Sequence, residues 1–159
     1  MIRGLALAVA LGFGTASLAQ TNINLGGISA DPTAPVEVTA DTLTVDQDSG
    51  TATFSGNVVI GQGDLRISAG AVNVVYSSET GDIARLLASG GVTFVTAREA
   101  AEATQADYDL TSGTLTLTGD VLLTQGASAL TAERMTVNLN TGSAQMSGRV
   151  RTVFQQGGN

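Results

Sequence analysis

Carboxylates are the side chains of this sequence that could perform acid–base chemistry. The 159 residues contain no histidine and no cysteine, so a Ser–His triad, a catalytic thiolate and a structural zinc site cannot be built. Asp107 and Asp109 flank Tyr108 and could form a general acid–base pair. Because alternate residues of a strand share one face, we interpret the two carboxylates as the solvated outer face of a strand. Catalysis is therefore not the expected activity.

Two acidic turns could bind calcium. The segment 46–50 reads Asp-Gln-Asp-Ser-Gly, the first steps of a calcium loop, and 61–64 reads Gly-Gln-Gly-Asp, a fragment of a calcium-binding β-roll repeat. Neither segment has the spacing or the consecutive copies that such sites need. We expect ordinary turn chemistry at both positions, and we predict neither a metal site nor a cofactor.

The charge balance limits the possible partners. The net charge is −7, and lysine is absent. Nucleic acid is not an expected partner, because binding it requires basic side chains that neutralise phosphates. Arg66, Arg134, Arg149 and Arg151 could contact the phosphates of a smaller ligand. As isolated charges they have a second interpretation, which is that they only keep the protein soluble.

The N-terminus has the pattern of a secretory signal peptide. Arg3 precedes an apolar run over 5–13, and Ser17-Leu18-Ala19 places small residues at the positions before a cleavage site. A retained membrane anchor is the alternative, but the run is shorter than the roughly 20 apolar residues that span a bilayer. We expect cleavage after Ala19, a polar N-terminal arm over 20–35, a β domain over 36–154 and a polar tail over 155–159.

An internal repeat organises the rest of the chain. Ser/Thr-Gly turns end at Gly50, Gly81, Gly113 and Gly142, and an alanine stands ten residues before each of these glycines. Apolar residues also precede each glycine by twelve, seven and five residues, except that tyrosine fills the last position twice. Four such units that cannot bury an apolar face alone predict stacked β repeats. No helical period of 3.6 residues competes with this interpretation.

The spacing also predicts an irregularity in each unit. The residues twelve and ten positions before the glycine have one parity, and those seven and five positions before it have the other. Since successive strand residues alternate between faces, an extra residue must separate the two pairs. We predict a β-bulge or corner between each alanine and the next apolar residue.

Parity selects the residues that should face inward. These are Leu43, Val45, Phe54, Val58, Ile60, Val74, Tyr76, Tyr108, Leu115, Leu117, Val121, Met135, Val137 and Met146. Periodicity alone favours an ordinary closed core for this set. A lipid-binding surface is the second interpretation.

A resemblance bears on that choice. Residues 38–46, 52–60 and Gln62-Gly63, echoed by 115–123 and Gln125-Gly126, are similar to the OstA-like family over nearly all of 36–154. The resemblance implies an all-β protein with an open, twisted, taco-like β-jellyroll in the periplasm, whose apolar interior holds the lipid A acyl chains of lipopolysaccharide. It also implies copies joined head to tail and related β-jellyroll partners in the inner and outer membranes.

An acidic protein can still bind an anionic lipid. Ten buried methylenes contribute roughly 8 kcal/mol, whereas a charge contact at 4 Å in water contributes about 1 kcal/mol. Burial of acyl chains can therefore outweigh the net negative charge.

The ends of the stack should carry unpaired strands near 36–40 and 148–154. No proline or lysine stands inside either segment, so we expect Val36, Val38, Val150 and Val153 to take part in end-to-end strand pairing. Two alternatives stay open. One is a self-assembling β-solenoid scaffold without a lipid ligand, and the other is an inner-membrane partner of the same family that keeps its N-terminal helix.

Overall fold

The computed structural model describes residues 23–24, 31 and 33–154. The expected signal peptide over 1–19, most of the arm over 20–35 and the tail over 155–159 lie outside the described residues. The strands are β1 (Ile23–Asn24), β2 (Glu37–Thr39), β3 (Thr42–Asp46), β4 (Thr51–Gln62), β5 (Leu65–Tyr76), β6 (Ile83–Val95), β7 (Glu99–Asp109), β8 (Thr114–Gln125), β9 (Ser128–Asn138), β10 (Ser143–Ser147) and β11 (Arg151–Val153). The described part of the chain contains no helix that could cross a membrane.

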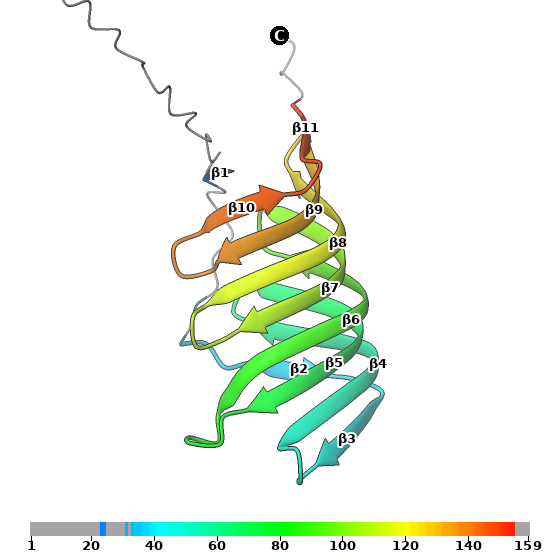
Figure 1. Ribbon diagram of the computed structural model, residues 1–159, viewed down its shortest axis with the longest axis vertical. Coiled ribbons are helices and arrows are strands. Elements are labelled where there is room, and N and C mark those ends of the chain that lie inside the picture. Colours follow the sequence, from blue (N-terminus) through cyan, green and yellow to red (C-terminus); the bar gives the residue numbers. More distant parts are fainter. Residues whose placement is uncertain (1–22, 25–30, 32, 155–159) are drawn as a thin grey trace, which may run out of the picture.

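The strands form one antiparallel sheet. From β4 to β10 each strand pairs with the next along the chain, and β1 pairs with β10. At one end β2 and β3 both pair with β4, and at the other end β10 and β11 both pair with β9. Figure 1 shows the stack running from β3 to β10 and β11, with β1 beside β10. The predicted all-β class is confirmed.

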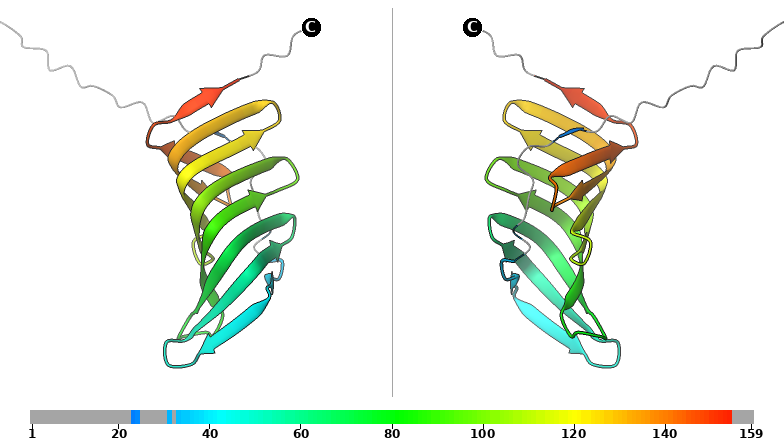
Figure 2. Two further views of the ribbon diagram at one scale, coloured as in Figure 1. Left: turned by 90° about the vertical axis from the view of Figure 1, so that its right-hand side faces the viewer. Right: turned by 90° about the vertical axis from the view of Figure 1, so that its left-hand side faces the viewer.

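A column of bends divides the sheet into two arms. Each of β4, β6 and β8 inserts an extra residue, at Gly56-Asn57, Gly90-Gly91 and Gly119-Asp120. Arm A consists of the half-strands 42–46, 51–55, 71–76, 83–89, 105–109, 114–118, 134–138 and 143–147. Arm B consists of 37–39, 58–62, 65–69, 92–95, 99–103, 121–125, 128–132 and 151–153. Figure 2 shows these strands tilted and stacked from two sides.

Glycine is required in this column for two reasons. Gly119 has φ +86°, in a backbone region that residues with a Cβ disfavour. A Cβ at this position would also lie 2.6 Å from Oγ1 of Thr104. The Thr104 hydroxyl instead donates a hydrogen bond to the Gly119 carbonyl over 3.2 Å. The missing side chain therefore allows the bend and makes room for the residue opposite it.

The predicted corner is confirmed in three units, but the extra residue lies in the neighbouring strand β4, β6 or β8 and not in the unit itself. The irregularity falls after Ala40, at Ala103–Thr104 and at Glu133, between the repeat alanine and the next apolar residue. In the second unit the prediction was wrong, because the shift lies between Ser68 and Ala71, before the alanine. Gly70 is the reason, since a Cβ there would lie 3.2 Å from the Gly90 carbonyl oxygen. Glycine allows the two backbones to approach closely at this point, and Ala71 consequently faces outward.

Candidate functional site

The inner face of arm A carries two apolar rows that run through every strand of the arm. Directly paired residues share a face of the sheet. The first row is Leu43, Phe54, Val72, Ala88, Ala106, Leu117, Met135 and Met146, and the second is Val45, Ala52, Val74, Leu86, Tyr108, Leu115, Val137 and Ala144. Ten of the predicted inward residues lie in these rows. They form a continuous apolar surface.

Arm B supplies the facing surface. Its main row is Val38, Ile60, Ile67, Phe94, Ala101, Leu123, Leu130 and Thr152. The predicted residues Val58 and Val121 follow next to the bend, and both are buried. Together the two arms bury one apolar cluster, in which Phe94, Leu115 and Met135 have no exposed surface.

Three predicted inward residues are exposed. Leu43 and Val45 are 54% and 60% exposed because β3 is the last strand of arm A and no described strand lies beyond it. Tyr76, at the end of β5, is 41% exposed. The inner surface therefore reaches solvent at the β3 end of the stack.

Sequence reasoning missed a set of polar side chains on the inner rim of arm B. The Tyr108 hydroxyl of arm A donates a hydrogen bond to Oε1 of Gln62 over 3.0 Å, and Nε2 of Gln125 donates to Oε1 of Glu99 over 2.7 Å. Gln62 and Glu99 are buried. Burial raises the pKa of both the Glu99 carboxyl and the Tyr108 hydroxyl. Parity could have found Glu99, since it alternates with the buried Ala101 and Ala103.

The four predicted arginines are not brought together. Arg66 donates to the Gly63 and Leu65 carbonyls at 2.6 and 2.8 Å, on the outer face of arm B. Arg149 lies at the bend, 3.3 Å from Oε1 of Glu133. Arg134 and Arg151 are exposed on the outer faces of arm A and arm B. Their contact with phosphate stays a prediction.

The acidic segments have structural partners. Asp107 pairs with the guanidinium of Arg85, and Asp109 accepts a hydrogen bond from the Ser112 amide over 3.0 Å. Asp46 accepts from the amides of Asp48 and Ser49 at 2.9 and 3.2 Å. Hydrogen bonds from the backbone lower the pKa of both Asp46 and Asp109. These carboxylates organise turns and strand pairs.

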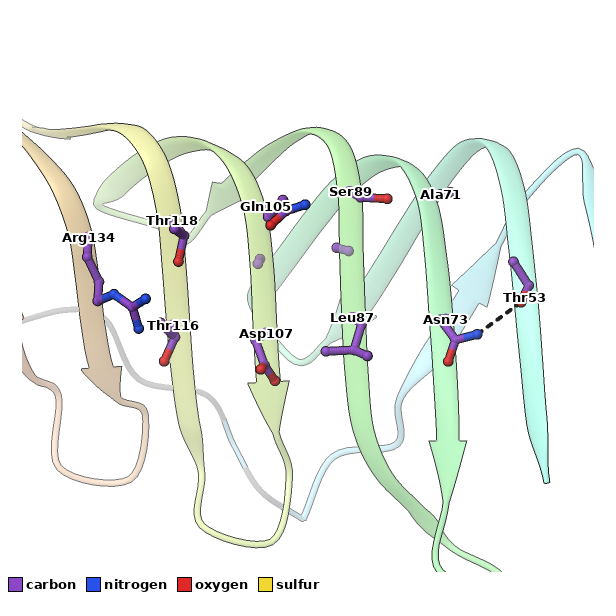
Figure 3. A pocket seen from close by; sticks show the side chains of 12 residues that line it. Thr53, Ala71, Asn73, Leu87, Ser89, Gln105, Asp107, Thr116, Thr118 and Arg134 are labelled. Carbon is purple, nitrogen blue, oxygen red and sulfur yellow. Dashed lines mark hydrogen bonds between the residues drawn. The ribbon is translucent and has the colours of Figure 1, made fainter. Parts of the chain in front are cut away.

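A shallow groove of about 490 Å³ crosses the outer face of arm A. Figure 3 shows side chains from neighbouring strands along it, from Thr53 and Asn73 to Thr116 and Arg134, with Asn73 donating to Oγ1 of Thr53 over 3.0 Å. Eight of the 12 lining residues carry hydroxyl, amide or charged groups, interspersed with alanine and leucine. This composition does not suit an acyl chain.

Both ends of the stack have strand edges that the described residues leave unpaired. At one end β2 and β3 pair only with β4, and at the other end β11 pairs only with β9. Val36 and Val38 are partly buried at the first end, whereas Val150 and Val153 are 48% and 49% exposed at the second. The outer edge of β10 is different, because β1 pairs with it at Ala144 and Ser143.

Comparison with known proteins identifies this architecture. Residues 37–143 match the family model described as LptA/(LptD N-terminal domain) LPS transport protein. The chain belongs to this family. An uncharacterized protein of Rhizobium meliloti (strain 1021) is 31% identical over 141 residues, which cover 83% of this chain and 76% of the relative. The resemblance to the OstA-like family is thereby confirmed.

A solved structure shows the same fold. It is the crystal structure of LptH from Pseudomonas aeruginosa, described as the LptA-homologous periplasmic component of the conserved lipopolysaccharide transport device. The match has a TM-score of 0.72 at 17% sequence identity and covers 80% of this chain and 99% of LptH. The bent, stacked sheet is therefore the β-jellyroll of the LptA family, as the resemblance implied.

Proposed function

We propose that the chain binds lipopolysaccharide and shields its acyl chains between arms A and B. The observation that supports this role is the apolar inner face, which continues through every strand of arm A and from β2 to β9 in arm B. Each methylene buried against such a surface contributes about 0.8 kcal/mol. A continuous surface can therefore hold a long acyl chain without depending on attraction between charges. The proposed role is transport, and it assigns no catalytic residue.

Lipid entry requires the arms to separate. The inner side chains already pack against one another, and the Tyr108–Gln62 hydrogen bond joins the two arms at the rim. Leu43 and Val45 extend the inner face into solvent at the β3 end. We infer that an acyl chain first contacts this end and then displaces contacts between the arms.

The N-terminal pattern supports a proposal for the cellular location. A cleaved signal peptide would export the mature chain, starting at Gln20, to the periplasm. LptH, which shares the fold, is described as a periplasmic component. We propose the same compartment for this protein.

Assembly is the second part of the proposal. The edges of β2, β3 and β11 that the described strands leave unpaired are templates for strand addition. Copies can join head to tail through such edges, and so can related β-jellyroll proteins of the inner and outer membranes. A heterologous contact of this kind can extend into a filament that bridges the two membranes.

Adjacent residues on opposite faces give a matched test of lipid binding. A photo-crosslinking side chain at Phe54, on the inner face, should capture lipopolysaccharide in cells, whereas one at Thr53, in the outer groove, should not. The pair Val121 and Asp120 repeats the comparison on β8. Equal capture from both faces would contradict the proposed binding surface.

The packed interior also favours a second candidate, a self-assembling scaffold without a lipid ligand. Several inner residues of the described chain have no exposed surface at all, as in an ordinary core. No capture from any position, together with filaments that contain no lipid by mass spectrometry, would support the scaffold instead.

A further inference from the structure

A row of polar side chains lines the inner rim of arm B, next to its hairpin turns. Gln62, Thr96 and Glu99 are all at least 91% buried, and Gln125 lies beside Glu99 across the β7–β8 pair. Glu99 alternates along β7 with the buried Ala101 and Ala103, so its side chain shares their inner face. Polar groups placed in an apolar interior need hydrogen-bond partners.

Most of the polar atoms of this row have such partners. Gln62 accepts from Tyr108, and its Nε2 donates to the Ala34 carbonyl over 3.3 Å. Oε1 of Glu99 accepts from Gln125, and the Glu99 amide donates to Oγ1 of Thr96 over 3.3 Å. The exception is Oε2 of Glu99, which is buried and has no hydrogen-bond partner among the described residues.

We propose that Oε2 of Glu99 forms a hydrogen bond with the polar group that links a bound acyl chain to the rest of its lipid. This linking group is an amide or carries a hydroxyl. The inference rests on the proposed lipid-binding function and specifies which lipids that site prefers. Glu99 stands at the rim, and the small side chains of Ala101 and Ala103 follow it towards the bend. An acyl chain lying on these alanines places its linking group beside Glu99.

The chemistry of a carboxyl group selects the ligand class. An ionised carboxylate oxygen accepts hydrogen bonds only, and a protonated carboxyl both donates and accepts. Hydroxyl and amide groups can donate and accept, so they pair with either form. A simple ester has no donor and can pair only with the protonated form, so the carboxyl discriminates against it when Glu99 is ionised. A phosphate carries the same sign of charge as an ionised Glu99. Arg98, at the turn beside Glu99, is the neighbouring cation.

The test uses neutral single-chain probes of equal chain length on the purified full chain. The probes are an N-alkyl fatty amide, a 3-hydroxy fatty methyl ester and the plain methyl ester, each displacing a fluorescent apolar dye. We expect the amide and the hydroxylated ester to bind about tenfold more tightly than the plain ester. Glu99→Leu should abolish this preference and keep the affinity for the plain ester.

Two further variants make the outcome decisive. Glu102→Leu changes an exposed carboxylate on the opposite face of the same strand and should leave the preference intact. Glu99→Gln keeps the shape of the side chain but offers an N–H donor to the ester carbonyl. It should therefore bind the plain ester more tightly and reduce the preference for the amide and the hydroxylated ester. This variant tests the inference even if Glu99→Leu does not fold. If wild type binds the three probes with equal affinity, or if the preference is unchanged in Glu99→Leu and Glu99→Gln, this inference is wrong. The proposed lipid-binding function would not be contradicted by either result. Failure of wild type to bind any probe would overturn the proposed function as well.

Discussion

The Tyr108 hydroxyl lies 3.0 Å from Oε1 of Gln62 and joins arm A to arm B. Tyr108 belongs to β7 and Gln62 to the end of β4, and both side chains are buried. The apolar interior is thus closed at this rim by a hydrogen bond between residues 46 positions apart. Opening the arms exposes two polar groups to water and breaks this bond.

Tyr108→Phe should destabilise the protein by about 1–2 kcal/mol, because Oε1 of Gln62 would stay buried without its donor. The measurement is urea denaturation followed by circular dichroism. Gln62→Leu serves as the second single variant of a double-mutant cycle. The cycle should give a coupling energy of about 1 kcal/mol between the two residues. Additive effects would show that the hydrogen bond does not join the arms.

Gly119→Ala should cost more stability than Gly126→Ala. Both glycines have positive φ, but a Cβ at Gly119 would meet the Thr104 side chain, whereas nothing lies within 4 Å of a Cβ at Gly126. Backbone strain alone costs about 1–2 kcal/mol, so Gly126→Ala should lose roughly that amount. Gly119→Ala should lose at least 1 kcal/mol more. Thermal or urea unfolding of the two variants measures these losses of stability. Equal losses in Gly119→Ala and Gly126→Ala would contradict the proposed role of the bend.

Glu99→Gln should stabilise the protein at neutral pH. Burial raises the pKa of Glu99 in the folded protein above its ordinary value of 4.5. The folded state then holds the proton more tightly than the unfolded chain, so stability is fully present below the ordinary pKa and falls as pH rises through the raised pKa. The gain in Glu99→Gln should reach about 1 kcal/mol at pH 7 and shrink towards pH 4.

Unfolding of wild type and Glu99→Gln across this pH range provides the measurement. Glu102→Gln, which changes an exposed carboxylate of the same strand, should have a stability difference that varies little with pH. If the free energy of unfolding differs between wild type and Glu99→Gln by the same amount at all pH values, Glu99 is not held in a desolvated site.

Charge on the exposed β11 edge should weaken head-to-tail assembly. Val153 and Phe154 are 49% and 73% exposed beside β11, which pairs only with β9 among the described strands. The double variant Val153→Asp/Phe154→Asp should fold normally and sediment as a smaller species at every concentration, since aspartate is disfavoured in paired strands. Val95→Asp, at a 40% exposed position on the outer face of β6, is the matched control.

Proline at Val150 tests the same edge by removing a backbone donor. It also follows Arg149, which has φ +45° at the bend, so loss of assembly in Val150→Pro must be compared with its unfolding curve. If the aspartate variants and Val150→Pro assemble as wild type does, the β11 edge is not the joint.

The all-β class, the four repeat units and the corner in most of them could be predicted from the sequence. These features are local, since alternation, turn glycines and the parity change between Ala103 and Ala106 depend only on the geometry of a single strand. The inward rows were predictable for the same reason, because parity assigns Phe54, Leu115 and Val137 to a common face.

Which of these residues are buried, and what lies opposite them, depends on how the two arms pack together. Leu43 and Phe54 share a face by parity, yet Leu43 is exposed because no described strand follows β3. The contact of Tyr108 with Gln62 arises only when arm A folds onto arm B, and so does the burial of the Glu99 oxygen that has no partner among the described residues. Such contacts depend on the distance in space between separate strands, and the spacing of residues within one strand carries no information about it.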